Sequence, residues 1–310
     1  MKALVTGGAG FIGSNVVLLL LEQGCQVRVL DKFSSGHRNN LEGLDIALTE
    51  GDIRDAETCL KACEGMDVVF HLAASVGRQR SLDFPQLDSE TNLIGTVNVL
   101  EGMRKHGVAR MVYSSSAAIF GEPETEAVSE DHPQNADSPY GVSKLAAEKM
   151  ILSYRGLYGM DTVCLRYFNV YGRHQRYDPY GNVIPIFARR LLDRQPLPIY
   201  GDGRQTRDFL NVRDVARANY LAAIGGRSGV YNLGSGTSIA IAQLAQWMQE
   251  VSGRTVGVTH GPRRPADVPH CGANTRKAKR EMGFSASVPL REGLAEYWQW
   301  LCGQEGEKKG

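Results

Sequence analysis

The sequence feature that most constrains the fold is a glycine-rich segment close to the N-terminus. A short apolar run, KALVT (2–6), is followed at once by GGAGFIGSNVVLLLLEQG and then by a second β-prone run, QVRVLD (26–31). A strand, a glycine turn, an apolar helix and a second strand in this order predict the opening unit of a parallel α/β sheet.

The glycines of this segment have the spacing of a dinucleotide-binding turn. Gly7 permits a tight turn, Gly10 permits close approach of a pyrophosphate, and Gly13 permits close packing of helix on strand. The N-terminus of the following helix supplies free N–H groups and a positive dipole for the phosphates. Asp31 ends the second strand, where it can accept hydrogen bonds from a ribose diol. A tight turn without a ligand would not explain Asp31, so we expect a dinucleotide site.

The same acid indicates which dinucleotide is bound. A carboxylate at Asp31 would repel the 2′-phosphate of NADP, which favours NAD. Lys32 and Arg38 follow it and could in principle receive that phosphate, although both are typical of charged loops. NAD is therefore the expected cofactor.

Strands and helices continue to alternate as far as residue 170. Further strands are predicted at 46–55, 66–75, 108–116 and 160–170, and helices at 56–64, 86–105 and 139–157. This alternation predicts an α/β fold of the Rossmann type, a doubly wound parallel sheet with right-handed crossovers. In such sheets ligands bind beyond the carboxyl ends of the strands. The residues expected at that edge are the turn glycines, Asp31, Asp52, Ile53, Ala73, Ala74, Ser116 and Asn169.

The amino-acid composition of the sequence changes after residue 170. Gly, Pro and Arg become frequent, and short elements follow, among them VYNLGSG (230–236) and a helix over 241–253. We expect an NAD-binding domain over 1–170 and a smaller substrate-binding lobe over 171–302, interleaved with the first and not independent of it. The charged tail GQEGEKKG (303–310) is predicted to be disordered.

Composition excludes several other classes of protein. The chain is 42% hydrophobic and 22% charged with a net charge of +1, so nothing indicates nucleic acid or an acidic membrane as a partner. The six cysteines contain no CxxC pair, which indicates reduced thiols and neither a disulfide framework nor a metal site. No apolar run reaches about 18 residues and no signal peptide fits before the first strand, so the expectation is a cytoplasmic protein.

A second motif lies in residues 111–150. Tyr140 and Lys144 are four residues apart at the start of a predicted helix, and therefore lie on one face of it. Asp137 and Ser138 both offer an N-cap for this helix, and Pro139 suits its first position. An ammonium group one turn away is expected to lower the tyrosine pKa from about 10, and a hydroxyl of the 114–116 serine run could share the proton. YxxxK spacing also arises by chance in many helices, and it is the accompanying dinucleotide motif that favours a proton-transfer unit.

Taken together, these motifs resemble the extended short-chain dehydrogenase/reductase family and, within it, the nucleotide-sugar 4-epimerases. The resemblance spans about residues 1–300 and rests on TGGAGFIG, HLAAS, TNLIGT, SSSAAIFG, SPYGVSK, RYFNVYG, GDGRQTRDF and RRPADV. It implies an NAD-dependent isomerase that inverts a UDP-hexose at C4 through a 4-keto intermediate.

The resemblance also implies the residues of the site. Tyr140 would be the catalytic base, Lys144 its electrostatic partner and a ligand of the cofactor ribose, and Ser116 the third catalytic residue. The cofactor would contact Gly7, Gly10, Phe11, Ile12, Gly13, Asp31, Lys32, Asp52, Ile53, Leu72, Ala73, Ala74, Asn92, Ser114, Tyr140, Lys144 and Phe168. The nucleotide sugar would contact Ser81, Ser116, Asn169, Asn182, Val183, Tyr200 on the uracil, Arg207 and Arg264 on the pyrophosphate, and Asp267 on the uridine ribose.

Two departures from the family pattern limit the reaction. Phe120 replaces the usual tyrosine of the serine loop, which is conservative in shape. Ala117 and Ala118 stand where related 4,6-dehydratases carry an Asp-Glu acid pair. Because elimination of water needs an acid to protonate the leaving hydroxyl, a dehydratase is disfavoured.

Two alternatives stay open at this point. Arg176 could pair with the carboxylate of a UDP-uronic acid, although a loop arginine facing solvent or phosphate is more common. A non-catalytic dinucleotide sensor would share the fold, but it would not need Ser116, Tyr140 and Lys144.

The resemblance further implies a selectivity gate at Cys271 beside the C2 substituent of the sugar. A small residue there admits an N-acetyl group, whereas a buried cysteine packing as a small hydrophobe is its commonest role. UDP-N-acetylhexosamines are therefore expected substrates besides UDP-glucose and UDP-galactose.

A homodimer is expected from two helices, 86–105 and 139–157, which in the resembled family form an intermolecular four-helix bundle. Both carry apolar positions beyond what one sheet face needs, unless these are internal core: Leu93, Val97, Leu100, Leu145, Met150 and Leu152.

Overall fold

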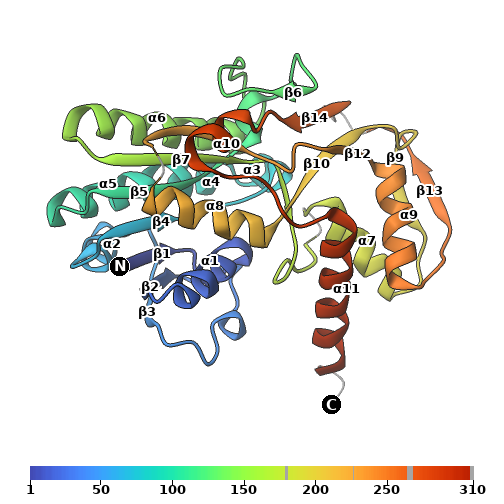
Figure 1. Cartoon of the computed structure of the whole chain (residues 1–310), viewed down its shortest axis with the longest axis horizontal. Helices are drawn as coiled ribbons and strands as arrows, with labels where there is room; N and C mark the ends of the chain where they lie inside the picture. The colour runs from blue at the N-terminus through green and yellow to red at the C-terminus, as the bar shows by residue number, and fades with distance from the viewer. Residues whose placement is uncertain (179–180, 226, 264–267, 308–310) are drawn as a thin grey trace.

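The computed structural model describes residues 1–178, 181–225, 227–263 and 268–307 (Figure 1). Its main element is a seven-stranded sheet in the order β11-β7-β5-β4-β1-β2-β3, in which every neighbouring pair is parallel. The strands are β1 (Lys2–Thr6), β2 (Gln26–Asp31), β3 (Ala47–Glu50), β4 (Val68–His71), β5 (Arg110–Ser116), β7 (Asp161–Tyr167) and β11 (Gly229–Leu233). The doubly wound α/β fold predicted from the sequence is confirmed.

Helices cover both faces of this sheet (Figure 1). One face packs on α1 (Phe11–Glu22) and α8 (Val212–Ile224), and the other on α2 (Ala56–Cys63), α5 (Gly95–His106) and α6 (Pro139–Tyr158). Along β1, Val5 belongs to the first of these cores and Leu4 to the second. Because both faces of a central strand are buried, its sequence is continuously apolar and does not alternate.

The third strand is shorter than the sequence predicts. It ends at Glu50, whereas the prediction ran to Asp52 and Ile53. The carbonyl of Asp52 accepts the N–H of Asp55 at 3.0 Å, which closes a turn, and the Asp55 side chain then caps α2. The turn geometry therefore ends the strand before the predicted adenine edge.

The predicted helix over 86–105 is interrupted. The chain forms α4 (Pro85–Ser89), a π-helical turn η2 (Glu90–Ile94) and then α5, preceded by an unpredicted helix α3 (Arg78–Asp83). π-turns are rare and frequently occur at functional sites. On α5, Leu100 is completely buried in the core between α5 and the sheet, so its assignment to a surface beyond the core was wrong.

The predicted strand over 160–170 is two strands in two sheets. β7 ends at Tyr167, where the N–H of Phe168 still bonds to the carbonyl of Leu233 at 3.1 Å. The chain then leaves the main sheet, and β8 (Asn169–Tyr171) pairs with a strand of the C-terminal part.

The segment VYNLGSG, which we grouped with the smaller lobe, returns to the main sheet as β11. It pairs with β7, with Val230 opposite Cys164, and Tyr231 is completely buried in the same core as α1. The division of the chain near residue 170 stays a prediction, with this strand as one place where the two parts interleave.

The C-terminal part forms smaller sheets around a third core (Figure 1). β10 (Thr206–Asn211) is central, with β12 (Ser238–Ala240), β14 (His270–Ala273), β6 (Ala127–Val128) and β8 in the same assembly. A separate pair joins β9 (Leu197–Tyr200) to β13 (Val258–Gly261). The helices are α7 (Val183–Leu192), α9 (Ile241–Ser252), α10 (Arg276–Met282) and α11 (Leu290–Glu307), and the 3-10 turns of the chain are η1 (Arg38–Asn40) and η3 (Ala117–Phe120).

Residues 303–307 of the tail differ from its predicted disorder, since α11 continues through Glu307, and residues 308–310 lie outside the described part of the chain. Gln and Glu are good helix formers, so the polar end extends the amphipathic helix that Leu294 and Tyr297 anchor in the core. Within the described ranges, no helix has the length and apolar character needed to cross a membrane.

Candidate active site

The glycine turn between β1 and α1 is closely packed on one side and open on the other. Gly7 has a φ of +71°, and a Cβ added at Gly13 would lie 2.1 Å from the carbonyl oxygen of Gly7. At Gly10 an added Cβ would meet only that same oxygen, at 3.2 Å, among the described residues. No described side chain caps α1, so the amides at its N-terminus are left for an anion. This cradle fits the pyrophosphate of a dinucleotide.

Asp31 has a second role that the sequence did not reveal. Its side chain is 8% exposed and accepts the N–H of Ala9 at 2.9 Å and that of Phe33 at 2.8 Å. The predicted ribose acceptor therefore also holds the glycine turn against the end of β2. Each carboxylate oxygen keeps a lone pair for a further donor.

The predicted adenine edge is a network of ion pairs. Asp52 pairs with Lys32 at 3.1 Å and with Arg54 at 2.7 Å. Burial raises the pKa of Asp52, but its bonds to Arg54 and Lys32 outweigh this and lower it to about 2. The pairing uses Lys32 within the protein, which speaks against a 2′-phosphate there. The Ile53 side chain is buried, and a Cβ added at Gly95 would meet it at 2.5 Å.

The segment after β4, with Leu72, Ala73 and Ala74, is held by Asn92 from the π-turn. Its side chain is 2% exposed, accepts the N–H of Ser75 at 2.8 Å and donates to the carbonyl of Ser75 at 3.0 Å. Asn92 was predicted to contact the cofactor directly, and the structure shows it orienting the backbone that lies at the sheet edge.

The predicted proton-transfer residues come together where β5 meets α6. Of the two candidate N-caps, Asp137 and Ser138, it is Ser138 that caps α6, by accepting the N–H of Gly141 at 3.2 Å. Ser116, at the end of β5, lies close enough to Tyr140, in the first turn of α6, for its hydroxyl to lower the pKa of the phenol. The Lys144 ammonium group donates to the carbonyl of Ser114 at 2.6 Å.

The electrostatics of this group differ from the prediction. Burial raises the pKa of Tyr140 to about 12, and the Ser116 hydroxyl lowers it by less. Burial lowers the pKa of Lys144 to about 8, against the opposing effect of the Asp88 carboxylate. The expectation that Lys144 lowers the pKa of Tyr140 was wrong, because the effect of burial on this pKa is larger. With a pKa of about 12, Tyr140 is protonated at neutral pH.

A buried ion pair lies behind the serine loop and was missed by the sequence analysis. Glu148 on α6 and Arg166 on β7 are 0% and 1% exposed and pair at 2.6 Å, with a second bond at 3.1 Å. Ser115 donates to the same carboxylate at 2.6 Å. The pair joins α6 to two strands and so fixes the helix that carries Tyr140. No spacing rule links a strand residue to a helix residue 18 positions away.

A small apolar cluster lies beside Cys271, the residue predicted to contact the sugar. Cys271 is half-buried and packs against the cluster that contains Ala117, Phe120 and Phe168. Burial raises the pKa of the Cys271 thiol to about 11, so it is neutral. Across the strand pair, Arg207 on β10 stands directly opposite Cys271 on β14.

Asn169 and the entry to α7 face the same region. The Asn169 amide donates to the carbonyl of Asp208 at 3.1 Å, and its side chain is half-buried. Asn182 is the exposed N-cap of α7 and, among the described residues, its side chain makes no capping bond. Val183 is the first residue of that helix and is half-buried.

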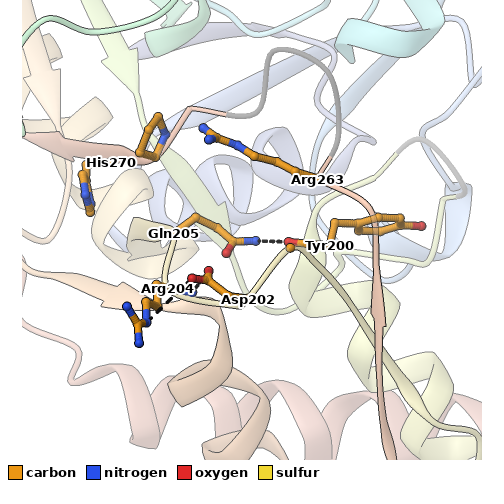
Figure 2. A pocket seen from close by; sticks show the side chains of 8 residues that line it. Tyr200, Asp202, Arg204, Gln205, Arg263 and His270 are labelled. Carbon is orange, nitrogen blue, oxygen red and sulfur yellow. Dashed lines mark hydrogen bonds and ion pairs between the residues drawn. The ribbon is translucent and has the colours of Figure 1, made fainter.

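A hollow of about 320 Å³ lies at what we call the nucleotide end of the site, beside Tyr200, which was predicted to pack on the uracil (Figure 2). The Gln205 amide crosses its floor and donates to the carbonyl of Tyr200 at 2.7 Å. Its lining is Tyr200, Gly201, Asp202, Arg204, Gln205, Arg263, Pro269 and His270. The volume is at the lower end of ligand pockets. The predicted ligands Arg264 and Asp267 lie outside the described residues, and Arg263 was not predicted.

Two predicted substrate ligands lie elsewhere. Ser81 is completely buried and its hydroxyl donates to the carbonyl of Arg78 at 2.7 Å, so it faces no open space. Arg176 donates to Asn40 at 3.5 Å, and Asn40 in turn donates to the carbonyl of Ala9 in the glycine turn at 2.9 Å. Because the Arg176 guanidinium group lies beside the cofactor turn, it does not support a binding site for the carboxylate of a UDP-uronic acid. The reason for considering that alternative substrate no longer holds.

Comparisons with known proteins agree with this arrangement along the whole chain. The model of the NAD dependent epimerase/dehydratase family matches residues 3–234. The UDP-glucose 4-epimerase of Halalkalibacterium halodurans is 37% identical over 320 residues, covering 97% of this chain and 95% of that protein. The solved UDP-N-acetylglucosamine 4-epimerase of Methanobrevibacter ruminantium, in complex with UDP-N-acetylmuramic acid, is similar with a TM-score of 0.94 and 32% identity, covering 98% of both chains. The solved UDP-glucose 4-epimerase of Thermus thermophilus, in complex with NAD, has a TM-score of 0.90 and 37% identity, covering 98% of this chain and 99% of that one.

Proposed function

Because the chain belongs to the NAD dependent epimerase/dehydratase family, we infer that it is an NAD-dependent epimerase acting at C4 of a UDP-sugar. The observation that supports this most directly is the meeting of Ser116, Tyr140 and Lys144 at the carboxyl edge of the sheet. That edge also carries the glycine turn. A protein that only senses the dinucleotide has no use for a half-buried tyrosine and a buried lysine beside a serine.

The chemistry divides between cofactor and protein. When bound, NAD accepts a hydride from C4 of the sugar and returns it, which no side chain can do. The turn of Gly7, Gly10 and Gly13 holds the pyrophosphate, and Asp31 the ribose.

Tyr140 exchanges a proton with the sugar 4-hydroxyl at its phenol oxygen, and the Ser116 hydroxyl lies close to that oxygen. Lys144, anchored by the Ser114 carbonyl, holds its positive charge one helical turn away. Binding energy resides on the UDP, which leaves the sugar free to present either face.

Replacing the phenol tests this assignment. In Tyr140→Phe the conversion of UDP-glucose to UDP-galactose should fall at least about 100-fold, since acid–base catalysis contributes 10²–10⁴. NAD content should stay unchanged. Tyr158→Phe, an exposed tyrosine at the end of the same helix, is the matched control. Near-full epimerisation by Tyr140→Phe, measured by chromatography of the sugar nucleotides, would reject the proposal.

We propose further that the enzyme accepts UDP-N-acetylhexosamines as well as UDP-glucose and UDP-galactose. The support is the small Cys271 side chain, which packs against the apolar cluster that contains Phe168, as Ala117 of the serine loop also does. One solved relative is a UDP-N-acetylglucosamine 4-epimerase.

Size at this position is the testable quantity. Cys271→Tyr should lose more than about tenfold in rate on acetylated substrates, because overpacking at the upper end of its range costs about 3 kcal/mol and 1.4 kcal/mol is tenfold. The rate on UDP-glucose should be kept. Cys271→Ala, which stays small, should leave both substrate classes unaffected. Equal loss on both classes in Cys271→Tyr would contradict a gating role.

We also propose that the chain forms a homodimer through the surface of α4, η2, α5 and α6. Apolar side chains are exposed there, namely Leu87 on α4, Ile94 on η2 and Val142 on α6, at 40%, 51% and 53%. Neighbouring exposed apolar residues mark interaction surfaces. Light scattering should give twice the chain mass for the wild type and one chain mass for Ile94→Asp. A monomeric wild type at micromolar concentration would refute the dimer.

A further inference from the structure

The segment after β8, residues 172–176, lies between the cofactor helix and the C-terminal helix. On one side, the Asn15 amide of α1 donates to the carbonyl of Arg173 at 2.9 Å. On the other, the Tyr297 hydroxyl of α11 donates to the carbonyl of Gln175 at 2.8 Å. The segment is therefore held by both parts of the chain.

His174 occupies the centre of this segment in a strained conformation. Its φ is +71°, a region that bulky side chains rarely adopt. The ring is 8% exposed, lies with Nδ1 2.7 Å from the Ser14 hydroxyl, and meets the Trp300 ring edge-on with 5.8 Å between centroids. A left-handed backbone in a buried histidine persists only when its surroundings impose it, and such positions cluster at functional sites.

The hydrogen bonds around His174 determine where its proton lies. Arg173 Nε donates to His174 Nε2 at 3.2 Å, so the neutral ring carries its proton on Nδ1. That proton is donated to Ser14 Oγ, and the Ser14 hydroxyl is donated to the carbonyl of Phe11 at 3.2 Å. Burial and the charges of Arg173 and Arg176 lower the pKa of His174 to about 4, so the ring is neutral as this pattern requires. Each donor in the chain meets an acceptor.

The series of hydrogen bonds from His174 through Ser14 ends on the Phe11–Ile12 peptide, which the cofactor would contact. The carbonyl of Phe11 and the N–H of Ile12 belong to one planar peptide unit. The Asn15 amide donates to that same carbonyl at 2.9 Å, so the oxygen is held from two directions. Ile12 is in the first turn of α1, where N–H groups lack a partner within the helix. Fixing the oxygen therefore fixes the direction in which the Ile12 N–H points.

We propose that His174 is a positioning residue for the cofactor, which acts through Ser14 to hold the Phe11–Ile12 peptide in its phosphate-binding orientation. An epimerase returns the hydride to the same sugar, so its cofactor must stay bound through both transfers. A residue that stiffens the pyrophosphate contact slows cofactor release. The proposal rests on NAD binding by the family cradle and is independent of which sugar is converted.

The test is the rate of NAD release from the holoenzyme. His174→Gly removes the ring and suits a positive φ, and Ser14→Ala removes the middle of the chain of bonds. Each should release NAD about tenfold faster, which corresponds to about 1.4 kcal/mol, because each removes one hydrogen bond that fixes the Phe11–Ile12 peptide. Release is measured as cofactor lost to a scavenging NAD-degrading enzyme in excess. Because both changes break one chain, the double variant should be no faster than either single variant.

Trp300→Leu separates positioning from packing. It removes the ring contact on the far side of His174 but leaves the bond to Ser14, so the melting temperature should fall while NAD release stays within about twofold of wild type.

Unchanged release in His174→Gly, additive effects in the double variant, or an equal acceleration in Trp300→Leu would each overturn the proposal. If His174→Gly does not fold, Ser14→Ala decides alone. Absence of UDP-sugar conversion would leave this measurement unaffected, so the two proposals fail separately.

Discussion

The two ends of the candidate site are built in different ways. At the cofactor end, Asp31 and Asn92 are at least nine-tenths buried and are bonded to backbone groups of Ala9 and Ser75. At the nucleotide end, long side chains such as Arg263 surround an open hollow of about 320 Å³. Buried groups that are already bonded do not reorganise when a ligand arrives, whereas exposed side chains do. The difference suits a cofactor that is retained and a substrate that is exchanged, and four substitutions test it.

The largest effect is expected for the ion pair behind the serine loop. Glu148→Gln leaves the buried Arg166 guanidinium without its counter-charge, which should lower the free energy of unfolding by about 3–5 kcal/mol in urea denaturation. Asp202→Asn is the matched control at the nucleotide end, because Asp202 pairs with Arg204 at 3.7 Å where both side chains are exposed. It should change stability by less than about 1 kcal/mol. Similar losses in both variants would remove the contrast between the ends.

The glycine turn should be the next most sensitive position. A Cβ at Gly13 would overlap the carbonyl oxygen of Gly7, so Gly13→Ala must displace the turn. We expect NAD affinity to fall about 100-fold, equivalent to about 2.7 kcal/mol, as measured by titration calorimetry. At Gly257, which directly precedes β13, an added Cβ would have its nearest described neighbour at 3.9 Å. Gly257→Ala should leave NAD affinity unchanged, and normal binding by Gly13→Ala would contradict the close-packed cradle.

The Asp52 ion pairs give a prediction with a pH dependence. Its folded pKa of about 2 is below the usual 3.8, so its contribution to stability is present above pH 4 and is lost as the pH falls toward 2. Asp52→Asn should cost about 1–2 kcal/mol at pH 7 after solvent screening, and progressively less below pH 4. The measurement is the difference between variant and wild type in urea denaturation at several pH values. If the difference in unfolding free energy between variant and wild type does not decrease in acid, the lost stability comes from packing and not from the ion pairs.

The smallest effect on stability is expected at Asn182. Asn182 and Asn211 both stand at helix N-caps, but only the Asn211 side chain accepts a backbone N–H, that of Arg213 at 2.9 Å. Asn211→Ala should cost about 1 kcal/mol, whereas Asn182→Ala should change stability by less than about 0.5 kcal/mol and raise the KM for the UDP-sugar. Thermal melts and steady-state kinetics measure the two quantities. Equal losses of stability would show that the nucleotide end is also organised before binding.

Short spacings in the sequence predicted local geometry that the structure forms. The turn of Gly7, Gly10 and Gly13 and the helical pair of Tyr140 and Lys144 lie in the expected turn and helix, while their roles stay predictions. The serine run left Ser114, Ser115 and Ser116 open as the third hydroxyl, and the family resemblance selected Ser116, which ends β5. The family membership follows from the same local motifs and was confirmed by the family comparison.

Residues that act through distant partners were not found. The pairing of Glu148 with Arg166 and of Ser14 with His174 joins elements that are separate in the chain, the second across 160 positions. The direction of the Tyr140 pKa shift was wrong for a related reason. Spacing indicated a nearby lysine, but the degree of burial that dominates the shift depends on every element packed around the tyrosine.

The sequence by itself determined the α/β class and the family, because both follow from short motifs and from the periodicity of apolar residues, while the cofactor-turn and proton-transfer residues stay predictions. The tertiary structure alone decided that β11 completes the main sheet and that Arg176 lies beside the cofactor turn. It also decided that Asp31 and Asn92 hold backbone segments in place. These outcomes depend on which surfaces meet when the chain closes on itself, and on how deeply each polar group is then removed from water. Neither quantity is a property of a short stretch of residues.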